Sequence, residues 1–473
     1  MRRHRNSFIF LITALLSLTT AAWAQEATPM QGMSNSVGFR ASGTSILPLS
    51  TLESSPMIHA SLGNWTFMFH ANAFLADIQQ SGARGRDKLF STNWFMPMMS
   101  RQFGRQSLTA RLMLSFEPAT ITKRQYPLLL QTGESAYGFS IIDGQHPHDF
   151  VMELAGRYDF NLAERSQLFV YGGPVGEAAL GPTGFPHRAS ASENPTGVLG
   201  HHRQDSTHIV SDVITLGFAQ GPVQVEASTF HGREPNETRW NIDSGKLDSF
   251  STRLTVSPHK SLAAQFSTGR INSPEELDLA IDTVRTTASL HHNLQWESGH
   301  VSSSLIWGRS KDLKNGTRRV FNSYNFETTV KFARHHWFWM RIENLDRDRS
   351  LLPLQASGQN PTCLLCGVVG VTPSQIEDSE VVQFPHVVPG PDGKPITVEE
   401  LPIGRVQAYT VGYERELPIG PSWLSMGLGG QLTGYGMTSQ LRGVYGSRPL
   451  TAVGFLRFRP KGNMAGHTMH THH

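Results

Sequence analysis

Apolar and polar residues alternate with a period of two through most of this chain. The pattern is clearest between Asp248 and Ile271, where every second residue from Phe250 to Val256 is apolar or threonine and the residues between are polar. The alternation resumes after a turn at residues 258–260. Successive side chains of a strand point to opposite faces, so this stretch predicts a β-hairpin with one apolar and one polar face.

The same alternation predicts about sixteen strands along the rest of the chain. They are expected at residues 65–78, 90–102, 107–117, 149–160, 166–175, 208–219, 223–231, 249–257, 261–270, 284–295, 300–309, 323–333, 336–346, 405–416, 422–433 and 451–459.

The connections between these strands alternate in length. Short links, such as residues 104–105 and 258–260, alternate with long ones, notably residues 118–148, 176–207 and 347–404. This alternation is typical of an outer-membrane barrel with periplasmic turns and extracellular loops. A soluble β-sandwich, which would bury the apolar rows between two sheets, gives no reason for it. We therefore predict an all-β, transmembrane antiparallel barrel of about 16 strands with long extracellular loops.

The polar rows of the predicted strands carry charges of both signs. In a barrel that crosses a lipid bilayer such side chains belong inside, facing the pore lumen. The predicted lumen residues are Arg111, Glu153, Arg157, Arg253, Arg341 and Glu343.

The N-terminus has the features of a cleaved secretory signal. Arg2, Arg3 and Arg5 precede an apolar run, and Ala22-Trp23-Ala24 forms a small-x-small cleavage site. We expect a signal peptide at 1–24, an irregular periplasmic lead-in at 25–56, the barrel at 57–460 and a Met/His-rich periplasmic tail at 461–473. The 41 basic and 38 acidic residues become balanced once three arginines are removed, so no nucleic-acid partner is predicted.

The last predicted strand, TAVGFLRF, ends in an aromatic residue, Phe458, as do closing strands that the barrel-assembly machinery recognises. The chain continues beyond it, which departs from that pattern. The expected partners are therefore this machinery and the lipid of the outer membrane.

The tail combines imidazole and thioether groups within ten residues. These are soft-to-borderline donors that suit copper or zinc. The candidate ligands are Met464, His467, Met469, His470, His472 and His473. A disordered polar tail or a cloning remnant is the alternative.

A second group of candidate ligands comes from consecutive long connections that strand parity places at one barrel rim. The connections contain the runs HPHD and HHRQDSTH, and their side chains are expected to converge on a divalent metal ion. The candidates are His146, His148, Asp149, His201, His202, Asp205 and His208. The alternative is that these groups only hydrogen-bond the loops to one another.

Two further readings compete with metal binding. Ser206 and His208, with Asp205 nearby, resemble the parts of a hydrolase site at a barrel rim, but their spacing does not establish a nucleophile and its base. A structural or adhesive surface protein is the other alternative. We name no catalytic residue, and a non-enzymatic role is favoured.

Cys363 and Cys366 lie in the longest connection. In an exported chain such a pair is expected to form a local disulfide. A zinc site would require a second pair of ligands, and only the distant His386 is available.

Four sequence blocks, DGQHPHDFVMEL, GFPHRASASENP, GHHRQDSTH and GREPNE, resemble blocks shared by a family of uncharacterised Gram-negative outer-membrane β-barrel proteins. The similarity covers roughly residues 64 to 310. It implies a barrel and an outer-membrane location, and it brings no activity with it. The sequence therefore predicts a pore or transport component that handles a soft transition metal such as copper.

The tail allows a direct test of this chemistry. A synthetic peptide of residues 461–473 should bind Cu(I) or Cu(II), and binding should weaken as its imidazoles protonate below about pH 6.5. Isothermal titration calorimetry at several pH values measures this. The same peptide with serine at its four histidines is the control, and equal affinity for both peptides would remove the assignment.

Overall fold

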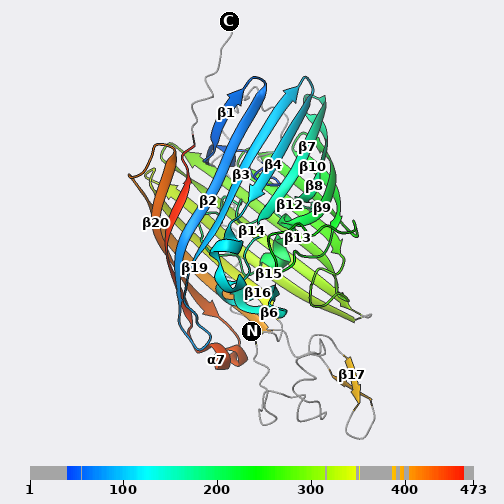
Figure 1. The fold of residues 1–473 in the computed structure, drawn as a ribbon, viewed down its shortest axis with the longest axis vertical. Coiled ribbons are helices and arrows are strands. Elements are labelled where there is room, and N and C mark those ends of the chain that lie inside the picture. The colour runs from blue at the N-terminus through cyan, green and yellow to red at the C-terminus, as the bar shows by residue number, and fades with distance from the viewer. Residues whose placement is uncertain are drawn as a thin grey trace. The chain divides into compact units, whose positions relative to one another are not determined.

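The structure, a computed structural model, describes residues 40–54, 56–314, 317–347, 351, 386–389, 395–398 and 404–462. Sixteen antiparallel strands form a closed barrel, because the last strand pairs with the first (Figure 1). Among the described residues, no helix is long and apolar enough to cross a membrane.

The barrel strands follow one another around the ring in chain order. They are β2 (Trp65–Gln80), β3 (Lys88–Phe103), β4 (Gln106–Leu114), β7 (Val151–Ala163), β8 (Ser166–Gly176), β9 (Val210–Gln220), β10 (Val223–His231), β11 (Ser249–His259), β12 (Leu262–Ile271), β13 (Asp282–Trp296), β14 (Gly299–Lys314), β15 (Thr317–Phe332), β16 (His336–Arg347), β19 (Gly404–Leu417), β20 (Leu424–Gly436) and β21 (Leu450–Pro460).

The remaining elements are short. They are α2 (Thr51–Ser54), β1 (Ile58–Leu62), α3 (Glu117–Thr120), η2 (Thr122–Arg124), β5 (Tyr126–Ala136), β6 (Phe139–Gln145), α4 (His201–Gln204), η3 (Ser206–His208), β17 (His386–Pro389), β18 (Pro395–Val398) and α7 (Ser439–Tyr445). Strand β1 extends the barrel wall beside the first residues of β2, and β17 pairs with β18.

The predicted barrel is confirmed, and each of the sixteen expected strands has its counterpart. The period of two sorts the side chains as expected: Phe250 and Leu254 are exposed on the outside, whereas Ser251 and Arg253 are buried inside. The links also differ in length at the two ends of the barrel, except that β14 and β15 extend further than predicted and are joined by only residues 315–316.

The connection at residues 177–208, named here the inner loop, lies inside the barrel instead of extending away from the rim. Most of its residues are buried. Arg341 donates to the carbonyl oxygens of Thr196 and Gly197 at 3.3 and 3.1 Å, and Gln431 bonds the Thr196 hydroxyl at 2.9 Å. These contacts come from strands on the opposite wall to β8, so the loop crosses the lumen.

Residues 40–54 also lie within the barrel. Arg111 donates to the Gly43 carbonyl at 2.7 Å, and Arg253 donates to the Thr44 hydroxyl at 2.9 Å. The described part of the expected lead-in is therefore held by inward-facing barrel residues.

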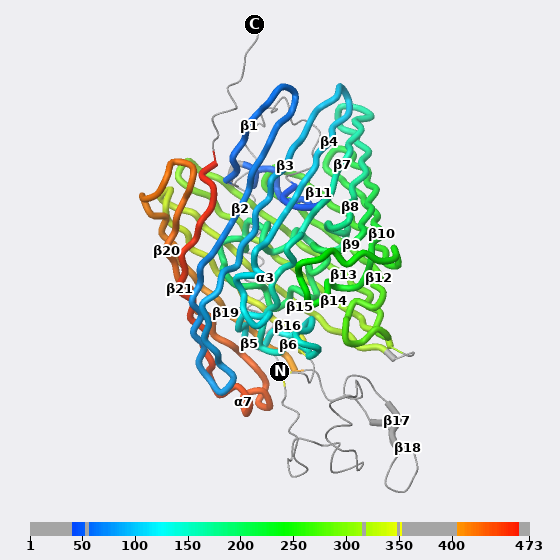
Figure 2. Tube along the Cα trace, in the orientation of Figure 1, coloured from blue at the N-terminus to red at the C-terminus, as the bar shows by residue number. Residues whose placement is uncertain are grey.

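The β5–β6 hairpin packs at the end of the barrel where α7 lies (Figure 2). The Tyr445 hydroxyl of α7 donates to Asp143 of β6 at 2.8 Å. Arg347 of β16 donates to the carbonyls of both Leu130 and Leu199, each at 2.8 Å. One guanidinium thus ties the hairpin, the inner loop and the barrel wall together.

The inner loop is also held by a buried ion-pair network. Arg188 contacts Asp205 at 2.6 Å and also Glu327 of β15, and all three side chains are inaccessible or nearly so. Removing one partner of such a network leaves an uncompensated buried charge.

Arg188→Ala should therefore lower the free energy of unfolding by about 3–5 kcal/mol and loosen the inner loop. Urea unfolding measures the first effect, and tryptic cleavage after Arg203 measures the second. Arg334→Ala is the control, since its ion pair with Glu297 is solvent-exposed. If the two variants behave alike, the network does not hold the loop.

Candidate metal centre

Five histidines from two connections gather inside the barrel next to the inner loop's short helices. His146 and His148 precede β7, His201 and His202 belong to α4, and His208 ends η3. The centre of the His201 ring lies 5.1 Å from the centre of the His202 ring and 5.1 Å from the centre of the His208 ring. His146 lies 5.7 Å from His202, and His148 lies 5.7 Å from His208. The sequence-predicted histidines are thus neighbours in space.

A possible ligand set is formed by Glu134, His146 and His202. One carboxylate oxygen and one nitrogen from each ring all lie within 4.8 Å of one another. Glu134 comes from β5, so the hairpin supplies the carboxylate of this set. Two imidazoles and one carboxylate with a free position form a known donor set for divalent transition metals. We name these three residues the Glu134 site.

The protons of His146 indicate why a cation suits this site. Its Nδ1 lies 2.9 Å from the Pro147 carbonyl oxygen, and its Nε2 lies 2.8 Å from a Glu134 oxygen. Burial, together with Arg239, lowers the pKa of His146 to about 4 despite the opposing effect of Glu134, so at neutral pH the ring carries a single proton. That proton can satisfy only one of the two oxygen atoms, and a metal ion on Nε2 would satisfy the other.

His202 is oriented in a similar way. Its Nδ1 faces a Glu234 oxygen at 3.6 Å, while its buried Nε2 has no hydrogen-bond partner among the described residues. Burial lowers the pKa of His202 to about 3, so the ring is neutral and keeps a lone pair. A carboxylate behind the distal nitrogen is a usual outer-shell arrangement for a metal-binding histidine.

Asp149 does not join this set. It lies 3.5 Å from Arg239, which also contacts the second oxygen of Glu134. Burial raises the pKa of Asp149 to about 7, although Arg239 opposes the shift. Arg239 therefore positions both carboxylates and offsets part of their negative charge.

His148, His201 and His208 form a second group, and each has a fixed Nδ1. His148 contacts a Glu117 oxygen at 2.9 Å, His201 contacts an Asp205 oxygen at 2.7 Å, and His208 contacts the Asp205 carbonyl at 2.7 Å. The Nε2 atoms of His148 and His208 are buried without a hydrogen-bond partner in the described part of the chain. Burial opposes ionisation of Asp205, but Arg188 and His201 hold its pKa well below the usual value. Asp205 is thus occupied by these partners.

The other predicted residues have clear positions where they are described. The six predicted lumen residues are all buried on the inner face of the wall, and several contact inner segments: Glu343, for instance, accepts from the Gly200 N–H at 3.2 Å. The Ser206 hydroxyl accepts from Arg285 at 2.8 Å, and His208 is turned to Asp205. The tail ligands, Cys363 and Cys366 lie outside the described residues.

Two functional candidates were missed from the sequence, Glu134 and Glu117. Both lie between β4 and β7: Glu117 begins α3, beyond the end of β4, although the expected strand at 107–117 included it, and Glu134 belongs to β5, where only a long link was expected. Part of this connection is a hairpin turning at Tyr137 and Gly138, and a Tyr-Gly turn between two short alternating runs was the available signal.

A scan of the sequence against protein families gave no match, and a search of curated proteins gave none. Solved barrels are similar in structure only. An anion-selective porin from Comamonas acidovorans gives a TM-score of 0.46 at 11% identity, covering 84% of this chain and 99% of the porin. OmpF of Salmonella typhi, in a complex with daunomycin, gives 0.43 at 6% identity, covering 85% and 100%. OmpT of Vibrio cholerae gives 0.43 at 7% identity, covering 85% and 99%. At these TM-scores the similarities add nothing to the fold that the strand pairing defines.

Proposed function

We propose that this chain is an outer-membrane barrel that acts as a transport component for a transition metal. Location in a membrane is supported by the outward face of the wall. Nearly every strand contributes large apolar side chains that are well exposed, among them Leu216, Val225, Phe250, Val411 and Leu432. An outward apolar band around a polar interior is the pattern expected of a barrel in lipid.

The observation that carries the metal assignment is the convergence of Glu134, His146 and His202. Imidazole and carboxylate are borderline-to-hard donors, so this site suits Zn(II) or Cu(II). The tail, which combines two methionines with four histidines, would suit Cu(I) as well. Copper is therefore the ion that both donor sets accept, and zinc is the alternative at the Glu134 site.

The inner loop limits the form that transport takes. It crosses the lumen, and Arg188, Arg341 and Arg347 hold it there. Passage of an ion in this proposal requires the loop to shift. The hydrolase alternative gains no support, because Ser206 bonds Arg285 and His208 bonds the Asp205 carbonyl.

The membrane location predicts the cost of a charge on the outer wall. Leu216 lies in the middle of β9 and is 60% exposed. Leu216→Arg should lower the free energy of unfolding in lipid vesicles by about 2–4 kcal/mol, whereas Leu62→Arg, at the end of β1, should cost about 0–1 kcal/mol. Urea unfolding in vesicles measures both, and equal costs would argue against a membrane-embedded midsection.

The metal site is tested by Glu134→Gln combined with His202→Asn. Zinc and Cu(II) affinity should fall at least about tenfold, because outer-shell changes alone cost about 10–100-fold. Titration calorimetry on folded protein measures this, in a background whose four tail histidines are replaced. His231→Asn is the matched control, since His231 pairs with Asp248 away from the site. Unchanged affinity in the double variant would overturn the assignment.

A further inference from the structure

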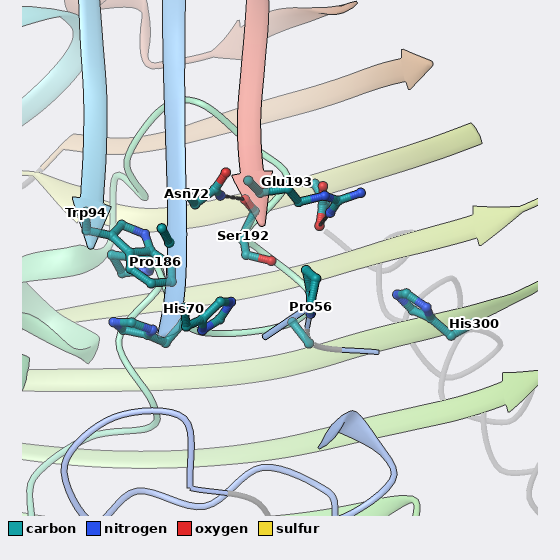
Figure 3. Close-up of a pocket in the computed structure, with 12 residues that line it drawn as sticks. Pro56, His70, Asn72, Trp94, Pro186, Ser192, Glu193 and His300 are labelled. Carbon is teal, nitrogen blue, oxygen red and sulfur yellow. Dashed lines mark hydrogen bonds and ion pairs between the residues drawn. The ribbon is translucent and has the colours of Figure 1, made fainter. Parts of the chain in front are cut away.

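A separate group of possible ligands lies on the barrel wall between β2 and β4, where the inner loop passes. Trp94, Met96 and Met113 are buried in one cluster. His70 on β2 is the cross-strand partner of Met96 on β3. His187 of the inner loop packs against them. Figure 3 shows His70 and Trp94 on neighbouring strands beside Pro186, with His300 across the adjacent pocket.

The contacts bring imidazole, thioether and indole together. His187 Nε2 lies 3.1 Å from the Met113 sulfur. The ring centre of His187 is 4.3 Å from that of Trp94, tilted by 51°. The His70 ring stands nearly perpendicular to Trp94 at 4.7 Å and lies 6.3 Å from His187.

Packing alone leaves the His187 ring poorly satisfied. Its Nδ1 is buried and has no hydrogen-bond partner among the described residues, and its Nε2 faces a sulfur atom, which is a weak acceptor. If Nδ1 carries the proton, a buried N–H is left without an acceptor. If Nε2 carries it, a buried lone pair is left without a donor. With the proton on Nδ1, the Nε2 lone pair faces the Met113 sulfur at 3.1 Å and neither atom has a proton to share, so this contact suits a soft cation bound by both.

The donor types select the kind of ion. Thioether and imidazole groups favour Cu(I), and the face of an indole attracts a cation. Glu193 is the acidic residue that lines the adjacent pocket, and it is engaged by Arg457 and Arg459. A site without a free carboxylate and near arginines disfavours a divalent ion relative to a monovalent one.

We propose that His187, Met113 and Met96, flanked by His70 and Trp94, form a binding site for a cuprous ion. The site lies next to a pocket lined by His70, Asn72, Trp94 and His187, which gives the ion space to approach. The inference rests on the proposed function only in treating the ion as cargo. Binding itself depends on the three ligands His187, Met113 and Met96.

The first experiment compares Cu(I) affinity between full-length variants. Folded protein with serine at the tail histidines and leucine at the tail methionines is titrated without oxygen against a bicinchoninate chelator. Met96→Leu with Met113→Leu keeps the side-chain volume nearly constant and removes both sulfurs. This variant should lose one Cu(I) equivalent, or bind it at least about tenfold more weakly. Met437→Leu, at a buried methionine in a different cluster, is the control and should change nothing.

A second measurement decides the case if the double variant does not fold. Trp94→Phe keeps every proposed ligand but removes the indole. Adding Cu(I) should quench tryptophan emission in the parent protein, and that quenching should be reduced in Trp94→Phe. Cu(I) binding that is equal in the parent and the methionine double variant would overturn the site. If the double variant does not fold, quenching that is the same with and without Trp94 would overturn it.

The outcomes separate this inference from the proposed function. Loss of Zn(II) binding in the Glu134 and His202 variant with Cu(I) binding intact supports two independent sites. Cu(I) bound at the methionine site, with no metal bound at the Glu134 site, would keep the inference and remove the evidence for the proposed function. If Zn(II) binds at the Glu134 site but no Cu(I) binding depends on Met96 and Met113, the proposed function stands and this inference fails.

Discussion

The contact between Arg188 and its two carboxylate partners is the interaction on which the interior of this barrel depends. Asp205 belongs to the inner loop and Glu327 to the wall, so one guanidinium joins the loop both to itself and to β15. Three charges buried together are stable only when each finds a partner. The pairing therefore fixes the path of the loop. It also sets the position of α4, which carries His201 and His202.

This arrangement explains how a wall with a polar inner face can enclose segments of its own chain. The inward rows of the strands are polar, as in a wide channel, but the inner loop and residues 40–54 supply their hydrogen-bond partners. Arg253 illustrates this, since it bonds Glu226 on the wall, the Gly181 carbonyl of the inner loop and Thr44. Burial in such surroundings lowers the pKa of His146 to about 4 and that of His202 to about 3, so both rings stay neutral and keep a lone pair, which is the state that metal binding requires.

The strands of the wall could be predicted from the sequence because each has one apolar and one polar face, and apolar and polar residues therefore alternate along it. Phe250 outside and Arg253 inside could be assigned without any long-range contact. The interior could not be predicted in this way. Whether residues 177–208 extend outward or fold inward depends on pairings such as Arg188 with Glu327, which are 139 residues apart. Glu134 was missed for the same reason, because its role depends on where an unrecognised hairpin packs. The histidines of HPHD and HHRQDSTH could be found because both runs are local signals, but they lie inside the barrel, buried or nearly so, and not at its rim.

The two candidate sites differ in donor chemistry in a way that follows from where their residues come from. The Glu134 site is built from a hairpin and loops, where carboxylates can be balanced by nearby arginines such as Arg239. The methionine site is built on the wall, where β3 and β4 supply the buried Met96 and Met113, and the inner loop adds His187. The carboxylate of the first site thus comes from the β5–β6 hairpin, and the thioethers of the second come from barrel strands. Copper suits both donor sets, but in different oxidation states, Cu(II) at the Glu134 site and Cu(I) at the methionine site, whereas zinc has little affinity for thioether ligands. The two donor sets together therefore favour copper over zinc, whereas the Glu134 site alone suits either metal.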